Sequence, residues 1–558
     1  MAWPGVSFLA NIINVSLIID ARRLTSPLRE PVDFVLISGE PYADHPLSGV
    51  GVIARVLESQ GWRVGVIGRP DWRHPESFQR LGRPRLGFGV TSGSIDSLLR
   101  NYNPLKRVRA RDPFSPHHSG IPDRAIIVYG NVLRHLYPDA PLIIGGVEAS
   151  LRRLAHYDYW ENRVRRSLLL DSRADILVYG PGELQIIEIA RRLAEGKDLA
   201  GIPGTCVVRR EVPEGFILLP SFEQVRDDPE AFIEMQRQLS NRRPLAQAHS
   251  NLYVLQFPFP DYRPEHLDWI YSLPFRRIIP PDFPDLRLAQ FSVVTHRGCI
   301  GRCSFCALAL HQGDRIISRS EASILKEIEL LSRHPEFKGI VDDLGGPTAN
   351  MYGLDCSNPC LEGECLSCSR LDRSHRRLIN LLRQARELPG IKKVLVRSGI
   401  RFDLAMESPE YLAELVNHHL SGWLKIAPEH VSAKVLRLMN KPTFKLDEFR
   451  ALFKRLNRGK KQYLKYYFMV AHPGTTREEA RQLASYIQKL RGEGPEPLEG
   501  VQVFTPTPMT RSTCMYYTGR DPLTGERVYV PRSFGEKKEQ KRLLQVKGRA
   551  VIPRRQRK

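Results

Sequence analysis

The stretch THRGCIGRCSFC, residues 295–306, decides the fold of this 558-residue chain. It follows the apolar run at residues 292–295 and brings Cys299, Cys303 and Cys306 into a single loop. Cysteine thiolates at such spacing can each bind a different iron of one iron–sulfur cluster. Three ligands for four irons leave one iron open, and an open position is typical of a reactive metal centre. The loop therefore predicts a catalytic iron–sulfur cluster just after a strand.

Short apolar runs and amphipathic helical patterns alternate on the C-terminal side of this loop. Six such units predict a partial (β/α)6 barrel at residues 289–518, with its chemistry on the loops after the strands. The expected strands lie at residues 292–295, 339–341, 393–396, 423–426, 466–470 and 501–504. The barrel pattern favours a cluster over the alternative, a structural zinc site with His296 or His311 as fourth ligand.

The N-terminal half has a similar rhythm, which predicts a doubly wound α/β domain at residues 31–200. Its expected strands lie at residues 33–37, 63–67, 125–129, 142–144 and 176–179. Two of them end in glycine-bearing loops, Gly145-Gly146 and Gly180-Pro181-Gly182, which either line a ligand pocket or serve as tight turns. Tight turns are the favoured interpretation.

The remaining segments differ in composition from these two domains. Residues 201–288 are rich in proline and aromatics and predict an inter-domain connection that packs against its neighbours. Residues 1–30 are expected to be a disordered leader, and residues 519–558 a C-terminal extension whose basic tail starts near Lys537.

Charge and cysteine content narrow the class of protein. A formal charge of +22 favours a polyanion partner such as RNA as much as it favours a merely solvated basic surface. Grouped cysteines in a large chain indicate metal or catalysis in a reducing compartment. No stretch has the length and purity of a membrane span, so a cytoplasmic protein is expected.

A second cysteine group stands at Cys356, Cys360, Cys365 and Cys368, an insertion within the barrel. Four thiols would close a tetrahedral site, which predicts either zinc or an auxiliary iron–sulfur cluster, with disulfides less favoured. The two isolated cysteines, Cys206 and Cys514, are expected to be buried small side chains.

The Cys-x3-Cys-x2-Cys loop, with Phe305 before its last cysteine, resembles the signature of the radical S-adenosylmethionine (SAM) superfamily. The resemblance implies that SAM binds the open iron and that the reduced cluster cleaves it to a 5′-deoxyadenosyl radical. It also implies an electron donor of the flavodoxin or ferredoxin type. The cofactor would perform the hard chemistry, while the protein orients it and shields it from water.

Further motifs, from about residue 33 to residue 522, resemble the YgiQ family of radical SAM proteins. They are DDLGGPTAN at 342–350, RSGIRFD at 397–403, LKIAPEH at 424–430, HPG at 472–474 and TPTPM at 505–509. The resemblance implies the architecture and the cofactor but no particular substrate.

The sequence departs from many radical SAM enzymes after Gly345-Gly346, where Pro347 replaces a glutamate that would hold the methionine amino group. Proline has neither an acceptor side chain nor an N–H. Asp342 or Asp343 is expected to supply the acceptor. Arg401 is expected to pair with the methionine carboxylate, and Ser398 of the same motif is included among the cofactor-binding residues.

Three polar residues close the predicted site. Lys425, Glu429 and His430 lie where a barrel strand gives way to its loop, a position that favours catalytic roles. A structural Glu–His hydrogen bond is the alternative.

The N-terminal domain resembles the cobalamin-binding-like domains that precede several radical SAM cores. Histidine ligation of cobalamin would need Asp-x-His-x-x-Gly, whereas DHPLSG at residues 44–49 has different spacing. Cobalamin is therefore not expected. The sequence as a whole predicts a radical SAM enzyme with RNA among the substrates to test first; the alternative is a non-catalytic iron–sulfur or zinc protein that binds nucleic acid or regulates.

Overall fold

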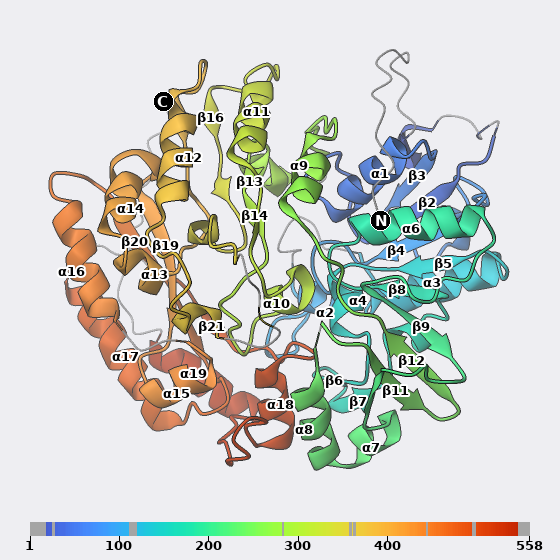
Figure 1. The fold of residues 1–558 in the computed structure, drawn as a ribbon. Coiled ribbons are helices and arrows are strands. Elements are labelled where there is room, and N and C mark those ends of the chain that lie inside the picture. The colour runs from blue at the N-terminus through green and yellow to red at the C-terminus, as the bar shows by residue number, and fades with distance from the viewer. Residues whose placement is uncertain are drawn as a thin grey trace.

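The computed structural model describes residues 18–24, 28, 30–110, 120–240, 242–281, 284–356, 360, 364–441, 445–493 and 498–544. Figure 1 shows a sheet half, blue to green, and a barrel half, yellow to orange. Helix α18 (Arg511–Thr518) contacts the first half through α8 (Pro229–Gln238), and α19 (Phe534–Leu544) contacts the second through α17 (Arg477–Gly492). Among the described helices, none combines the length and apolar character that a bilayer crossing requires.

The sheet half is built on one ten-stranded sheet in the order β1-β3-β2-β4-β5-β8-β9-β12-β11-β10. Neighbours from β1 to β8 run parallel, and β8, β9, β12 and β11 pair antiparallel. The strands are β1 (Ile18–Asp20), β2 (Phe34–Ser38), β3 (Val64–Gly68), β4 (Gly87–Thr91), β5 (Leu142–Ile144), β8 (Ile176–Val178), β9 (Thr205–Arg209), β10 (Ile217–Leu219), β11 (Leu245–His249) and β12 (Leu252–Gln256).

Strand β2 shows why this sheet is covered on both faces. Phe34 and Leu36 belong to a core that includes α1 (Gly49–Ser59) and α6 (Glu183–Ala194). Val35 and Ile37 point the other way, into a core that includes α3 (Ala125–Leu136). Because successive side chains of a strand alternate between faces, a strand that is apolar throughout needs helices on both sides. The prediction of a doubly wound domain is confirmed.

One predicted strand of this domain is wrong. Residues 125–129 begin helix α3, whose Ile126, Tyr129 and Leu133 form one buried helical face. A short apolar run does not distinguish a strand from a buried helix. The strand between β3 and β5 in the chain is instead β4, whose two glycines weaken the strand pattern in the sequence. A Cβ at Gly89 would lie 2.7 Å from Leu36 Cδ2, so close packing explains that glycine.

Two segments expected outside the sheet contribute to it. Ile18–Asp20, predicted as part of a disordered leader, forms β1 and pairs with β3, while residues 1–17 lie outside the described residues. The connection at 201–288 carries β9 to β12, which extend the sheet. The prolines lie outside these strands, at residues such as Pro213, Pro220 and Pro258, so a composition rich in proline does not exclude strands.

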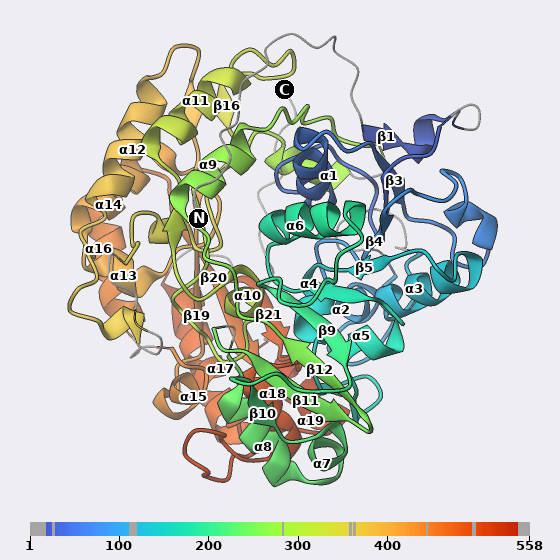
Figure 2. The same ribbon diagram turned by 45° about the vertical axis from the view of Figure 1, so that its right-hand side comes forward.

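The barrel half confirms the prediction of a partial barrel. Its paired strands are β13 (Val293–Val294) with β17 (Leu344–Gly345), β16 (Ile340–Val341) with β18 (Lys393–Val394), and β19 (Trp423–Glu429), β20 (Tyr463–Val470) and β21 (Leu498–Val503) in sequence, all parallel. A bridge between Ile400 and Ile426 links the series. Helices α11 (Glu321–Leu331), α12 (Arg376–Glu387) and α16 (Leu446–Leu456) cover its outer side in both views (Figures 1 and 2).

The C-terminal segment differs from the expected basic tail. Lys537 lies within α19 and is fully buried, and its ammonium donates to the hydroxyls of Tyr159, at 3.1 Å, and Tyr516, at 3.0 Å. Burial lowers the pKa of Lys537 to about 8. A lysine predicts solvent exposure from its charge alone, but here phenolic oxygens and aromatic faces surround it. Residues 545–558 lie outside the described residues.

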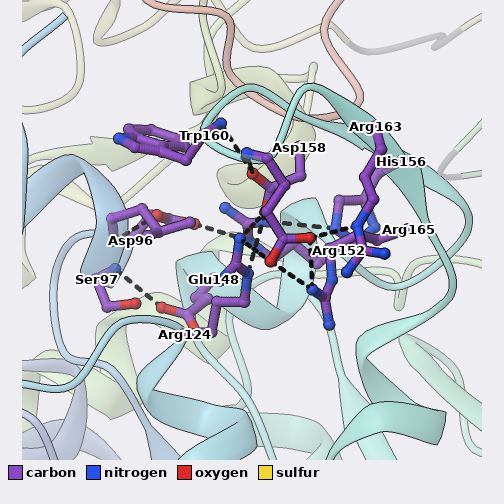
Figure 3. Close-up of polar contacts among 12 residues, drawn as sticks. Asp96, Ser97, Arg124, Glu148, Arg152, His156, Asp158, Trp160, Arg163 and Arg165 are labelled. Atoms are coloured by element: carbon purple, nitrogen blue, oxygen red, sulfur yellow. Dashed lines mark hydrogen bonds and ion pairs between the residues drawn. The ribbon is translucent and has the colours of Figure 1, made fainter. Parts of the chain in front are cut away.

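A buried polar network fixes the sheet half beneath α4 (Val147–Leu151) (Figure 3). Arg152 Nε donates to Asp96 Oδ2 at 2.9 Å, and Arg152 Nη1 lies 3.4 Å from Asp158 Oδ2. Arg124 Nη2 reaches the same Asp158 oxygen at 2.8 Å. Glu148 accepts the Ser97 backbone N–H at 2.9 Å. Both arginine-paired carboxylates are almost fully buried, so the network depends on Arg152 for its charge balance.

Replacing Arg152 by leucine should lower the free energy of unfolding by about 3–5 kcal/mol, because Asp96 would remain buried without its cation while Asp158 would keep only Arg124. Urea denaturation followed by circular dichroism measures this change. The control is Arg163→Leu, whose side chain is 65% exposed beside Glu161 and should change stability by less than about 1 kcal/mol. Equal losses in the two variants would contradict a structural role for Arg152.

Candidate functional site

The cysteine loop follows β13 and the short strand β14 (His296–Arg297), and its backbone requires a glycine at one position. Gly298 has φ +85°, and a Cβ there would lie 1.7 Å from the carbonyl oxygen of Arg315. The Cys299 N–H donates to the Gly313 carbonyl at 3.1 Å, and the Cys306 N–H to the Cys303 carbonyl at 3.0 Å. These contacts hold the three cysteines in one compact loop.

Cys299, Cys303 and Cys306 line a single cavity of about 410 Å³ at the ends of the barrel strands. A Cβ at Gly301 would lie 2.8 Å from Arg401 Nη1, so the absence of a side chain there lets the guanidinium approach the loop, while Cys299 Sγ at 3.4 Å and Cys303 Sγ at 3.8 Å lie close by. We call the space that the three cysteines line the cluster cavity. Among the described residues, no three Cys, His, Asp or Glu side chains converge as ligands of one ion would. Cysteines that each bind a different iron do not need to converge on a single point.

The zinc alternative lacks its fourth ligand. His296 Nδ1 lies 2.9 Å from Thr295 Oγ1, and His311 Nδ1 lies 2.9 Å from Ser150 Oγ. Both rings line a different cavity from the three cysteines. Neither histidine therefore completes a tetrahedral site with these sulfurs.

Burial and nearby charge act on the thiols in opposite directions. Burial raises the pKa of Cys299, and it raises the pKa of Cys306 to about 12. Arg401 Nη1 lies 3.8 Å from Cys303 Sγ and places a positive charge beside the sulfurs. Such a charge favours thiolates and, in an iron–sulfur protein, raises the reduction potential.

Arg401 and Lys425 both line the cluster cavity but differ in their partners. The Arg401 guanidinium is engaged by Asp403, with Nε–Oδ1 at 3.1 Å and Nη2–Oδ2 at 2.6 Å. Its bidentate face is therefore already occupied. No carboxylate among the described residues forms an ion pair with Lys425, which leaves that ammonium available to an anionic ligand.

Glu429 and His430 separate at the end of β19. Glu429 has φ +66°, lines the cluster cavity and lies 3.6 Å from Lys441 Nζ. Burial raises its pKa. His430 is fully buried behind the cavity wall, where its Nδ1 accepts the Ser432 N–H at 3.0 Å. The alternative, a structural hydrogen bond between Glu429 and His430, is not found among the described contacts, and Lys441, which sequence reasoning missed, is the partner of Glu429.

A second cavity, of about 620 Å³, lies between the ends of the sheet strands and the barrel. Gly345, Gly346 and Asp343 line it, as do the predicted glycine loops at 145–146 and 180–182. Asp342 lines neither cavity and accepts the Phe291 N–H at 3.0 Å. The two cavities share Leu308, Pro347 and Ser398 in their walls, so they are neighbours.

Comparison with known proteins agrees with this architecture. The chain matches the family models "Radical SAM N-terminal" at residues 20–296, "Radical SAM superfamily" at 293–487 and "Domain of unknown function (DUF3362)" at 499–550. A UPF0313 protein of Methanocella arvoryzae is 45% identical over 545 residues, covering 92% of this chain and 90% of the relative. One of Clostridium perfringens is 44% identical and covers 93% and 83%.

The chain belongs to the UPF0313 family of radical SAM proteins. Membership confirms the prediction of a radical SAM enzyme and implies a 4Fe–4S cluster and SAM as its cofactors. Its fold is that of TsrM from Kitasatospora setae, a radical SAM methyltransferase solved with cobalamin and a [4Fe-4S] cluster bound. That match has a TM-score of 0.52 at 18% identity and covers 87% of this chain and 76% of TsrM.

In this UPF0313 protein the second cysteine group lies beside the first. Cys365 and Cys299 both pack against one apolar cluster, which includes Ile300 and Leu404. Arg242 Nη1 donates to the Cys360 carbonyl at 2.6 Å. Residues 357–359 and 361–363, which separate these cysteines, lie outside the described residues. Cys206 and Cys514 are buried, as expected.

Cysteine alkylation tests the electrostatics of the UPF0313 loop in metal-free protein. With its pKa near 12, Cys306 is about one part in ten thousand thiolate at pH 8. Hydrogen bonds from Arg370 instead lower the pKa of Cys368. Iodoacetamide should therefore label Cys368 more than about 100-fold faster than Cys306, as followed by mass spectrometry. Cys206, whose pKa burial also raises to about 12, is the slow control; equal rates at Cys306 and Cys368 would contradict the geometry.

Proposed function

We propose that Cys299, Cys303 and Cys306 hold a 4Fe–4S cluster and that the protein uses it with SAM to oxidise or modify an organic substrate. The single observation that supports this is the wall of the cluster cavity, where three thiols of one loop lie with Lys425, for which no described residue supplies an ion pair. When bound, the reduced cluster would supply one electron for cleavage of SAM to a 5′-deoxyadenosyl radical.

The chain's own residues would position SAM. We assign the methionine carboxylate to Lys425, because Arg401 is already bound by Asp403 and remains beside Cys303. We assign the methionine ammonium to Glu429, which lines the cluster cavity and has only the long 3.6 Å ion pair with Lys441, since Asp342 and Asp343 are engaged with backbone N–H groups outside this cavity. Glu429 would thereby replace the acceptor that Pro347 cannot provide. Phe305 lines the same cavity and would exclude water from the cluster.

Anaerobic reconstitution tests the proposal. Protein supplied with iron, sulfide and dithionite should form 5′-deoxyadenosine from SAM, measured by liquid chromatography. Cys303→Ala should abolish cleavage, because one iron loses its ligand. Cys514→Ala, at a buried cysteine of α18, should retain both the cluster and the cleavage. A protein that takes up a full cluster but never cleaves SAM would refute the radical chemistry.

Lys425→Met distinguishes SAM binding from cluster binding. Loss of an unpaired ammonium should raise the KM for SAM by about ten- to a hundredfold while the cluster spectrum stays unchanged. Lys425→Arg keeps the charge and should restore most of the affinity. An unchanged KM in Lys425→Met would reassign the carboxylate to another residue.

For the second cysteine group we propose a site that binds either zinc or an auxiliary iron–sulfur cluster. Four thiols on one short segment close to the first loop suit either. Metal analysis of Cys303→Ala separates them, because iron that survives this substitution belongs to the second group, whereas zinc would identify a structural site.

Two further proposals concern cobalamin and the substrate. The spacing of the DHPLSG segment at residues 44–49 argues only against ligation by a histidine. It does not exclude cobalamin itself, because TsrM shares the fold and was solved with cobalamin bound. His45 would not ligate it, since its Nε2 contacts the Gln290 carbonyl at 2.9 Å and its Nδ1 accepts the Leu47 N–H at 3.1 Å.

The net charge of +22 supports RNA as the first macromolecule to test as a substrate, with a flavodoxin or ferredoxin as the reductant of the cluster.

A further inference from the structure

The larger of the two cavities is too big to be a packing defect. Protein interiors contain few voids larger than a water molecule, whereas ligand pockets have volumes of about 300–1,000 Å³. At about 620 Å³, this cavity falls within the second class. It lies beyond the carboxyl ends of the parallel strands β2, β4, β5 and β8, where doubly wound sheets bind ligands.

Charged side chains in its described wall are already compensated. Glu183 Oε1 pairs with Arg297 Nη1 at 2.7 Å, and its other oxygen accepts from the Tyr262 hydroxyl at 2.8 Å. Glu40 is paired with buried Arg100 and accepts the Ser94 N–H at 3.0 Å. The wall therefore presents no unpaired guanidinium to a phosphate or carboxylate.

Asp343 is the remaining charged residue of the wall, and among the described residues its carboxylate is held by hydrogen bonds and not by an ion pair. Its Oδ1 accepts the backbone N–H groups of Arg397, at 2.7 Å, and Ser398, at 3.1 Å, and its Oδ2 accepts from the Ser398 hydroxyl. Three donors to one carboxylate leave little capacity for an ammonium ligand. The wall thus suits neither sign of charge.

Two neutral polar atoms in the wall lack a partner. His296 Nε2 and Ser292 Oγ are buried and form no hydrogen bond of normal geometry within the described chain, although the Thr348 backbone lies near enough to act on the His296 ring. Burial lowers the pKa of His296 to about 3, so its ring is neutral at physiological pH. Buried polar atoms are normally paired, so an unpaired donor or acceptor in a cavity wall indicates a missing partner. Most of the other wall residues are glycines or aliphatic side chains from the two halves.

We propose that this space, the acceptor cavity, binds the substrate, and that the substrate's bound part is uncharged and mainly apolar with a hydrogen-bonding edge that meets His296 and Ser292. The inference rests on the proposed function, because the shared wall of Leu308, Pro347 and Ser398 sets such a substrate beside SAM in the cluster cavity. An apolar partition of this kind also limits water at the point where a radical would act.

The partner chemistry can be tested with one ring in three charge states. Indole is a rigid apolar ring with a single N–H donor, indole-3-acetate adds a negative charge and tryptamine a positive one. Binding to the full-length, anaerobically reconstituted protein is measured by isothermal titration calorimetry without SAM. Indole should bind at least about tenfold more tightly than either charged analogue. Equal or tighter binding of a charged analogue would overturn the proposal.

Gly145→Leu tests the location. Gly145 lines the acceptor cavity, has no left-handed backbone, and a Cβ there would lie 3.6 Å from the Val178 carbonyl oxygen, so a larger side chain fits by filling the cavity. It should weaken indole binding at least about tenfold. The control is Gly492→Leu at the exposed end of α17, where a Cβ meets nothing within 4 Å, and indole binding should not change. Unchanged binding in Gly145→Leu would place indole elsewhere.

The role of His296 is tested by removing each side of the hydrogen bond. In the unaltered protein, 1-methylindole should bind more weakly than indole, and in His296→Leu this difference should shrink, because Ser292 is the one proposed partner that remains. An unchanged difference in a folded His296→Leu would exclude His296 as the partner. If that variant does not fold, the Gly145→Leu comparison still decides the location.

These binding measurements are independent of SAM cleavage. A protein that binds indole in this pattern but never forms 5′-deoxyadenosine would refute the proposed function and leave the ligand class standing. Hydroxocobalamin provides the opposing outcome. If it displaces indole and Gly145→Leu prevents its own binding, the cavity is a corrin site and the substrate proposal is overturned.

Discussion

The buried ion pair between Arg297 and Glu183 is the contact on which the arrangement of this protein depends. Glu183 begins helix α6 of the sheet half, and Arg297 lies two residues before Cys299 in the barrel half. Their side-chain atoms approach to 2.7 Å, and Tyr262 and Tyr271 add hydrogen bonds to the two ends. Neither charge could remain buried alone, so the two halves are held together at the cysteine loop.

This constraint explains why both cavities form where they do. The loop that carries the cysteines has one face toward the strand ends of the barrel and the other toward the glycine loops of the sheet. The first face is charged, with Arg401, Lys425 and Glu429, and suits a zwitterionic cofactor. On the second face the charged side chains are held by ion pairs or hydrogen bonds, and most of the other side chains are apolar. A single short segment therefore separates two different chemical environments.

Much of this could be predicted from the sequence, because periodic patterns and cysteine spacing are local properties. The partial barrel, the doubly wound sheet and the cysteine loop follow from such patterns. The pairing of Asp343 with backbone N–H groups does not, since it depends on how segments far apart in the sequence meet. The pairing of Arg401 with Asp403 and of Glu429 with Lys441 depends on side-chain orientation, which residue spacing does not determine. Residues 125–129 show the other limit, because a buried helix and a buried strand have the same apolar composition.

The position of α18 and α19 has a consequence for how the chain matures. These helices are the last described elements, and they contact both halves, with Lys537 enclosed between Tyr159 and Tyr516. The sheet half and the cysteine loop are thus translated long before the residues that clamp the two halves together. Until α18 has been made, the Ser512 N–H cannot donate to the Ser304 carbonyl of the cysteine loop, so metal can be delivered to the cysteines before this last contact forms.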